Sequence, residues 1–437
     1  MSLHRPIIAF SLVLAVAGCQ SYAPAPLPDK TDLTERLPAQ AVQPLDMTAV
    51  ATVAVLNNPD LRAARAKARI AQAQAFAAGI LPNPELTANF DPPIGGGSLV
   101  AGYGLGIAYD IQALIVQPAN IAAANAARDQ ARLDLLWQEW QTVAQARNLY
   151  VQRINASEKR ELYAALETRY ATQAERSGRA LQMGDVTFDT AGIDLAALLD
   201  VRSQLSTAER GTSQADYSLR TLLGVAPQVE VPLQPLMPPP IPDRAAIDAA
   251  LARVAQLRPD LRALQFGYQS QEQNLRKAVL AQFPSLSLGI GAANDTTNVH
   301  TISLGATLNL PLFNRNQGEI AIQGATREQL RAEYQARLDQ ATGDAWRIWT
   351  EMQQLNSAIA DIEARLPDLQ VAAENAERAY LNGDLPALTY VTLQSAVLNR
   401  QSELSDLKQS LWSDAIALSS VIGTQIQPDI EVKEPMP

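Results

Sequence analysis

Pro59-Asp60-Leu61-Arg62 recurs as Pro259-Asp260-Leu261-Arg262, at an offset of 200 residues. Further along the chain, Gly184-Asp185 recurs as Gly383-Asp384, at an offset of 199 residues. Landmarks that return at a nearly constant spacing over such a distance indicate a duplicated unit. We therefore predict that the 437-residue chain consists mainly of two internal repeats.

The two repeats are separated by a segment that is rich in proline. Seven prolines fall between residues 227 and 242. Because proline cannot continue a helix or a central strand, this segment is expected to be a crossover connection. The predicted boundaries are 46–226 for the first repeat, 227–245 for the crossover and 246–425 for the second repeat.

Each repeat reads as a helix, two strands, a long helix and a returning helix. In the second repeat, apolar residues alternate with Ser, Thr, Gly and Asn at Ile302, Leu304, Ala306, Leu308, Leu310 and Leu312. This period of two predicts a strand, and its length and small or polar second face are typical of outer-membrane barrel strands. We expect such strands within about 85–112 and 285–313. Hairpins from a soluble β-sandwich are the alternative interpretation.

Four strands are too few for a closed barrel, because the smallest known type has about eight. Open strand edges are not tolerated in lipid. The predicted fold class is therefore mainly α with a membrane β-barrel portion, and several chains must contribute strands to that barrel.

The third part of each repeat predicts a helix of unusual length. Residues 119–183 contain no proline and only one glycine, so that a continuous helix would be about 97 Å long. Its counterpart, about 318–382, has the same reach but contains Pro367, which we expect to kink it. Faces rich in Ala, Leu and Val favour side-by-side, coiled-coil-like contacts between such helices.

Both long helices end at a Gly-Asp pair. Gly184 and Gly383 can adopt the left-handed conformation that ends a helix, and Asp185 and Asp384 are expected to cap the helices that run back. The tips of the two helical hairpins would then lie on the order of 100 Å from the strands.

The N-terminus predicts export from the cytoplasm. Residues 1–18 combine a basic start, an apolar run and small residues before Cys19, which is typical of a secretory signal peptide. Val16-Ala17-Gly18-Cys19 resembles the bacterial lipobox, which implies that Cys19 is lipid-modified. Gln20 implies sorting to the outer membrane rather than retention at the inner one. Residues 19–45 read as a lipid-anchored, Pro-rich tether, and 426–437 as a C-terminal tail.

Composition excludes several classes of function. The net charge of −10 has the wrong sign for a protein that binds nucleic acid. One Cys and two His leave no basis for a disulfide framework, a zinc site or imidazole catalysis, and no Gly-x-Ser-x-Gly motif is present. His300 reads as a solvated loop residue. We predict neither an enzyme nor a resident metal, and no cofactor apart from the lipid on Cys19.

Taken together, these features resemble the TolC-type outer-membrane efflux factors. The resemblance rests on Cys19, the duplicated halves, the Gly-Asp tips, and the motifs Asn57-Asn58-Pro59-Asp60-Leu61-Arg62, Leu81-Pro82-Asn83-Pro84 and Leu308-Asn309-Leu310-Pro311-Leu312-Phe313-Asn314-Arg315. The chain is most similar to the lipoprotein branch that serves metal-efflux and related resistance–nodulation–division (RND) pumps.

This resemblance implies a homotrimer, with a twelve-stranded β-barrel that continues into a periplasmic α-helical barrel. It further implies a periplasmic membrane-fusion adaptor that contacts the tip residues Gly184, Asp185, Gly383 and Asp384, and an inner-membrane RND transporter. The protein would sit in the outer membrane of a Gram-negative bacterium and extend into the periplasm. Where the family prototype closes its entrance with Asp rings, this chain has Thr389 and Thr392, so that Asp185 and Asp384 are alternative members of the entrance constriction.

The expected function is passive conduction of substrate, either heavy-metal cations or drugs, out of a tripartite pump. The nearest alternative is the channel of a type I protein secretion system. A periplasmic coiled-coil lipoprotein scaffold without a pore is a further alternative.

Overall fold

The computed structural model describes residues 22–37, 44–97 and 99–424. The chain divides into two compact units, Met1–Thr34 and Glu35–Pro437, and every helix and strand described below belongs to the second. The expected signal peptide, Cys19 and the tail 426–437 lie outside the described residues.

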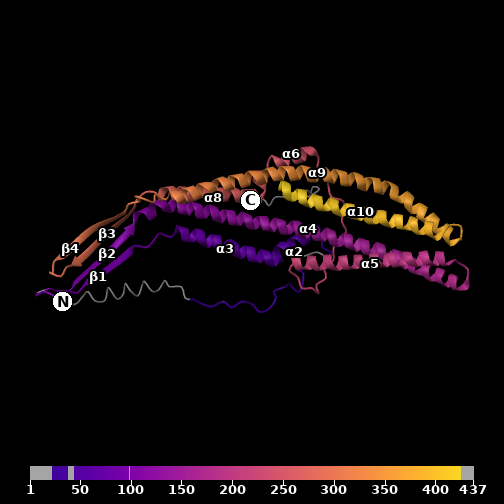
Figure 1. Ribbon diagram of the computed structural model, residues 1–437, viewed down its shortest axis with the longest axis horizontal. Coiled ribbons are helices and arrows are strands. Elements are labelled where there is room, and N and C mark those ends of the chain that lie inside the picture. The colour runs from indigo at the N-terminus through magenta and orange to yellow at the C-terminus, as the bar shows by residue number, and fades with distance from the viewer. Residues whose placement is uncertain (1–21, 38–43, 98, 425–437) are drawn as a thin grey trace, which may run out of the picture. The chain divides into compact units, whose positions relative to one another are not determined.

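The elements follow one another in the same order in each half of the second unit, except that two short helices, α6 and α7, stand in the second half where the first has α2 (Figure 1). The first half contains α2 (Met47–Asn57), α3 (Pro59–Gly79), β1 (Glu85–Asp91), β2 (Gly102–Asp110), α4 (Ile111–Met183) and α5 (Phe188–Leu222). The second half contains α6 (Arg244–Leu251), α7 (Val254–Leu257), α8 (Pro259–Leu280), β3 (Ser285–Asn294), β4 (His300–Asn309), α9 (Gln317–Leu381) and α10 (Ala387–Ile422).

The four strands form one antiparallel sheet in the order β1-β2-β3-β4. One row across it is apolar and exposed, and consists of Leu86, Ile107, Ile290 and Leu304. The adjacent row consists of Thr87, Gly106, Gly291 and Ser303, whose side chains point to the opposite face. The sheet therefore has one apolar and one small or polar face, as the alternation in the sequence predicts.

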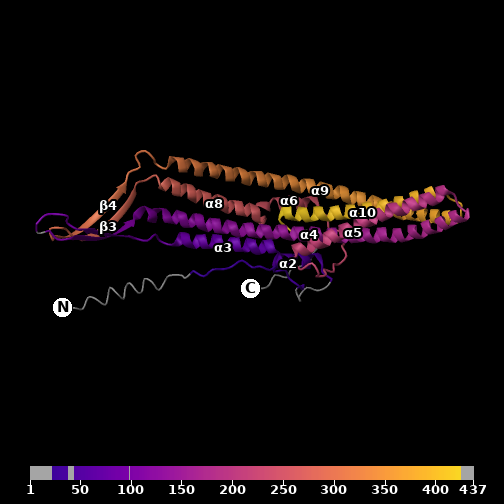
Figure 2. The same ribbon diagram turned by 60° about the horizontal axis from the view of Figure 1, so that its bottom comes forward.

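The helices form a layer beside the sheet (Figures 1 and 2). Nearer the sheet, α3 packs on α4, α4 on α8, and α8 on α9. Farther away, α5 and α10 pack on α4, and α10 also packs on α9. The turn between α4 and α5 and the turn between α9 and α10 lie at the end of this unit opposite the sheet (Figure 1). Among the described residues, none of the helices combines the length and apolarity needed to cross a bilayer.

The long helix of the first half starts earlier than the sequence predicts. We expected it to begin at about 119, but α4 begins at Ile111, directly after β2, and Asp110 caps it by accepting hydrogen bonds from the backbone N–H groups of Gln112 and Ala113. Pro118 therefore lies inside the helix, where it removes one backbone hydrogen bond without ending the helix. In α9, the helix likewise continues through Pro367.

The returning helices end against the start of each half. Gly224 and Gly423, which follow α5 and α10, both have positive φ angles, of 61° and 75°. A Cβ atom on Gly224 would lie 2.5 Å from the carbonyl oxygen of Asn57. Beside it, the amide of Asn58 donates a hydrogen bond to the carbonyl of Leu222 at 2.9 Å. Glycine is thus required at Gly224 by both conformation and space.

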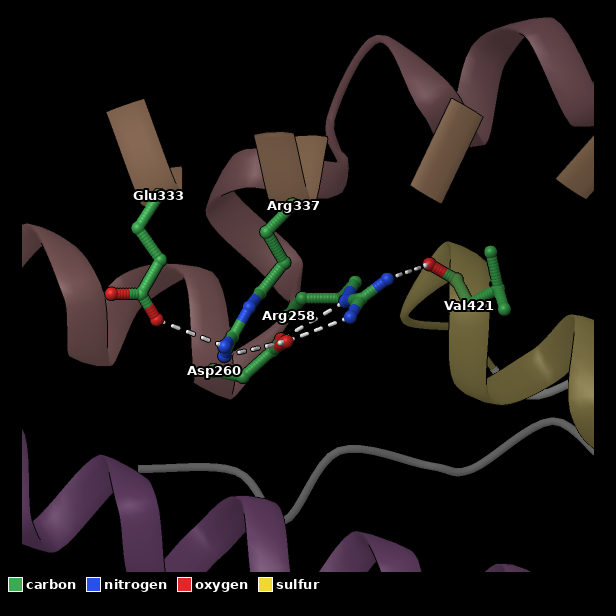
Figure 3. Close-up of polar contacts among 5 residues, drawn as sticks. All are labelled: Arg258, Asp260, Glu333, Arg337 and Val421. Carbon is green, nitrogen blue, oxygen red and sulfur yellow. Dashed lines mark hydrogen bonds and ion pairs between the residues drawn. The ribbon is translucent and has the colours of Figure 1, made fainter. Parts of the chain in front are cut away.

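The second half makes the equivalent junction with a charged group (Figure 3). Arg258 donates to the carbonyl oxygen of Val421 at 3.3 Å and forms a two-pronged ion pair with Asp260, with N–O distances of 2.9 and 2.7 Å. Arg337 of α9 lies 3.7 Å from the same carboxylate and 3.2 Å from Glu333. Arg258 and Asp260 are buried, so the ion pair ties α8 to α9 and α10 away from water.

The Pro-rich crossover is fixed by the long helices. The hydroxyl of Tyr150 on α4 donates to the carbonyl of Gln234 at 2.6 Å, and the indole N–H of Trp349 on α9 donates to that of Pro242 at 2.9 Å. Leu45, which is fully buried, forms a short parallel bridge with Leu233. These contacts make the crossover part of the apolar core.

Replacing Gly224 by Ala tests the junction at the base of the first hairpin. The added Cβ would clash with the Asn57 carbonyl, so we expect the free energy of unfolding to fall by about 1–3 kcal/mol. Thermal unfolding followed by circular dichroism should show a lowered midpoint. Gly178→Ala is the control, because that glycine lies within α4 with no atom within 4 Å of the added Cβ. An unchanged midpoint for Gly224→Ala would contradict the steric argument.

Candidate functional site

The two hairpin tips are built in the same way. α4 ends at Met183, and Gly184 follows with a φ of 81°; the N–H of Asp185 then donates to the carbonyl of Ala180 at 2.9 Å. After α9, Gly383 has a φ of 84°, and the N–H of Asp384 donates to the carbonyl of Ala379 at 2.9 Å. Each tip is a glycine-dependent helix end that satisfies the last carbonyl groups.

Asp185 and Asp384 do not cap the returning helices, so that expectation is wrong. The N-cap of α5 is Thr187, whose hydroxyl accepts a hydrogen bond from the N–H of Thr190, and the N-cap of α10 is Pro386. Each Asp lies two residues before the N-cap of the returning helix. Its own N–H closes the turn after the long helix. Both Asp side chains are consequently exposed at the tips.

Thr389 and Thr392 lie on the first turns of α10. Both are exposed, and their spacing of three residues places them on the same face of the helix. The hydroxyl of Thr392 donates to the carbonyl of Leu388 at 2.7 Å, so that its polar group is satisfied locally. At these two positions α10 therefore presents hydroxyl groups and not carboxylates.

A groove lies between the two hairpins near their tips. Gly383 and Asp384 line it together with Arg176 and Ser177 of α4 and Thr190 of α5. The tip of the second hairpin therefore lies next to α4 and α5 of the first hairpin. Gly184 and Asp185 are not among the residues that line it.

A buried carboxylate joins the hairpins just above this groove. Asp194 of α5 is 2% exposed, and its Oδ2 accepts hydrogen bonds from the hydroxyl of Tyr380 on α9 at 2.8 Å and from the amide of Gln173 on α4 at 3.2 Å. Gln173 also donates to the Tyr380 hydroxyl at 2.9 Å. Three helices from both hairpins thus meet at one side chain.

Aromatic stacking supports this carboxylate. The ring of Tyr380 stacks on Tyr390 of α10, with centroids 4.9 Å apart and an interplanar angle of 6°. Burial, and then the hydrogen bond to Asp194, raises the pKa of Tyr380 to about 12. The hydroxyl therefore stays protonated at neutral pH and remains a donor to Asp194.

Sequence reasoning missed Asp194, Gln173 and Tyr380. The available signal was the position of Asp194, which falls in the same stripe of α5 as the buried Ala197, Leu198 and Val201. An acid within an apolar stripe indicates a partner on a neighbouring helix. Its partners are distant in sequence, and no spacing along the chain identifies them.

The described residues contain no group of three or more His, Cys, Asp or Glu side chains placed to hold a metal ion. His300 begins β4, is exposed, and pairs across the sheet with Asn294.

Replacing Tyr380 by Phe tests the tie between the hairpins. The variant keeps the stacked ring but removes a donor from a buried carboxylate, which typically costs about 1–3 kcal/mol. We expect faster amide hydrogen exchange in α5 around Asp194 and in the first turns of α10. Tyr217→Phe is the matched control, because Tyr217 is 57% exposed on the same helix α5. Equal exchange in the two variants would show that the hydroxyl does not hold the hairpins together.

Comparisons with known proteins agree with this geometry. The model of the family "Outer membrane efflux protein" matches residues 250–424. The cation efflux system protein CusC of Escherichia coli K12 is 23% identical over 51% of this chain, and the matched region spans about half, 50%, of the length of CusC. The probable outer membrane lipoprotein SilC of Salmonella typhimurium is 20% identical over 95% of this chain and 98% of its own length.

Solved structures share the fold along nearly the whole chain. The crystal structure of CusC has a TM-score of 0.72 at 19% identity, and covers 86% of this chain and 92% of its own. That of the outer-membrane channel OprN has a TM-score of 0.75 at 16% identity, and covers 94% and 100%. The family model matches the second half of the chain, and the fold that the chain shares with these solved structures extends over the first half as well.

Proposed function

We propose that this protein is the outer-membrane channel of a tripartite efflux pump. The observation that carries the proposal is the sheet, which has one exposed apolar face, one small or polar face and two open edges. An apolar face suits lipid and a polar face suits a water-filled lumen. The protein sits in the outer membrane of a Gram-negative bacterium, and its helices extend into the periplasm.

Closure of the sheet requires other copies of the chain. Each copy supplies four strands, so that a homotrimer supplies twelve, three times four, which is enough for a barrel with no edge exposed to lipid. The two halves act as internal repeats, and the helices of three copies continue the barrel as a periplasmic α-helical tunnel. Cys19 carries the lipid that anchors the tether, a point that the mass of the mature N-terminal peptide would test.

Transport through such a channel is passive. The lumen supplies a wet path, and the energy comes from an inner-membrane RND transporter. A periplasmic adaptor links that transporter to the tips, at Gly184, Asp185, Gly383 and Asp384. The entrance constriction is formed by Thr389 and Thr392, or by Asp185 and Asp384. Separation of the hairpins at Asp194 and Tyr380 would widen the entrance.

The substrates we propose are heavy-metal cations or drugs. CusC is named as part of a cation efflux system, whereas OpmQ of Pseudomonas aeruginosa, 24% identical over 95% of this chain, is named for pyoverdine export. Type I secretion of a polypeptide is the alternative. A deletion strain that becomes sensitive to metal ions or drugs favours efflux, and one that fails to export a protein favours secretion.

Conduction is the first test. Trimers purified in detergent should produce stepwise ionic currents in planar lipid bilayers, and the trimer should dissociate on heating in electrophoresis. A water-soluble monomer without conductance would fit the pore-free periplasmic scaffold and would refute the channel.

The second test addresses the tips. Asp185→Lys and Asp384→Lys reverse the charge of the exposed tip carboxylates, and we expect about tenfold weaker capture of the periplasmic adaptor, because like charges and lost complementarity disfavour docking. Asp248→Lys on α6 is the control, since its side chain is 61% exposed and remote from the tips in sequence. Undiminished capture by both tip variants would place the adaptor elsewhere.

A further inference from the structure

A small cavity lies between α4 and the C-terminal end of α10. Its volume is about 130 Å³, well above the roughly 15 Å³ that a cavity needs to hold one water molecule. Trp140, Val143 and Ile416 give it a largely apolar lining, and Thr424, the last described residue, lies at its edge. The cavity therefore has room for a side chain from the segment 425–437, which lies outside the described residues.

Of the described residues that line this cavity, one is charged, Arg147. Its Nε is buried and has no hydrogen-bond partner among those residues. Burial lowers the pKa of Arg147, and no charged neighbour in the described part of the chain opposes that effect. Charges taken out of water are almost always paired in folded proteins, because an uncompensated buried charge is costly. The site therefore calls for a carboxylate.

The acids nearest in sequence do not supply it. On α10, Asp414 interacts with Glu351 and Arg347 of α9: burial and then Glu351 raise the pKa of Asp414 to about 6, and Arg347 lowers it. Arg147 is not among the groups that affect Asp414. On α4, the residues three and four positions from Arg147 are all uncharged, namely Val143, Ala144, Tyr150 and Val151.

The segment that follows α10 is acidic. Residues 425–437 contain three acids and one base: Asp429, Glu431, Glu434 and Lys433. The helix ends at Ile422, and Gly423 follows with a φ of 75°, so that the chain leaves the helical path at the cavity. The segment therefore starts at the cavity and carries the charge that complements Arg147.

Hydrogen bonds between α4 and α10 set the relative positions of the two helices. The amide of Asn155 donates to the hydroxyl of Ser405 at 2.8 Å, and the hydroxyl of Tyr163 donates to that of Ser402 at 3.3 Å. Residue numbers rise along α4 as they fall along α10, so the helices are antiparallel. Continued to the cavity, this register places Arg147 near the level of Ile416.

That register fixes how far the acidic segment must reach. Ile416 lies eight residues before Thr424 on α10, which is about 12 Å of helix. An extended chain advances about 3.3 Å per residue, so that about four residues cover this distance. Pro428 favours an extended conformation at the residue before it. Asp429, the fifth residue after Thr424, is the first acid that reaches Arg147.

We propose that the C-terminal segment folds back along α10 and inserts Asp429 into the cavity, where its carboxylate pairs with Arg147. Hydrogen bonds between a guanidinium and a carboxylate are among the strong ones in proteins, and they would satisfy both buried charges. The contact fastens the end of α10 to α4. It forms within one copy of the chain and is independent of the proposed channel.

Amide hydrogen exchange followed by mass spectrometry tests the pairing in the full-length protein purified in detergent. We expect residues 425–432 of the unaltered protein to exchange at least tenfold more slowly than a free chain, because docking restricts opening of the backbone. Asp429→Asn should remove most of this protection, and so should Arg147→Glu. Arg147→Glu combined with Asp429→Arg should restore it. Glu434→Gln is the matched control, because this acid belongs to the same segment but lies ten residues after Thr424.

The tail variants keep the test valid if Arg147→Glu does not fold, because Asp429→Asn leaves both helices unchanged. Loss of protection in Asp429→Asn but not in Glu434→Gln supports the pairing. Free-chain exchange at 425–432 in the unaltered protein, or equal losses in these two variants, overturns it. A folded double variant that stays unprotected also overturns it. If residues around Arg147 lose protection only when copies dissociate, while the tail exchanges freely, a second copy is the occupant and the proposal is wrong.

Discussion

The rest of the structure depends on how a single layer of helices buries apolar surface. A helix in a globular core can bury one broad face, but a helix in a single layer has neighbours only at its two sides. Each helix of such a layer therefore needs two narrow contact stripes on opposite sides. The residues of one stripe follow those of the other by two positions in the sequence. The Ala-rich composition follows from this constraint, because small side chains in both contact stripes allow neighbouring helices to pack closely. The longest of these helices are α4, with 73 residues, and α9, with 65.

Larger side chains are concentrated where the layer becomes thicker. Tyr150, Leu219 and Val231 belong to one core cluster beneath the crossover, and Met352 and Ile348 to another. The two halves fasten their returning helices at equivalent places with different chemistry. Asn58 uses a neutral amide, whereas Arg258 uses a buried ion pair that is shared with Arg337. Burial of an ion pair costs desolvation, so the second junction depends on the completeness of its hydrogen bonds.

Much of the fold was accessible from the sequence, because its signals are local and repeated. The period of two predicted the strands, and the Gly-Asp pairs predicted both tips, since only glycine adopts the required left-handed turn without strain. The start of α4 was not predicted correctly, because Pro118 is a helix breaker by propensity and is tolerated here by its context. The prediction that Asp185 and Asp384 cap α5 and α10 was wrong, because both residues belong to the backbone turn that ends the preceding long helix. The contact of Asp194 with Tyr380 joins residues 186 positions apart, which local patterns do not encode.

The glycine at the base of each hairpin has a mechanical consequence. α5 contains 35 residues and is therefore about 50 Å long, and it ends next to Gly224, where a side chain is sterically forbidden. Glycine offers the widest range of backbone angles of any residue. A rotation of about 5° at such a pivot displaces the far end of a 50 Å lever by roughly 4 Å, more than the diameter of a water molecule. A rotation of α5 about its Gly224 end would therefore displace the tip of the first hairpin much farther than its base.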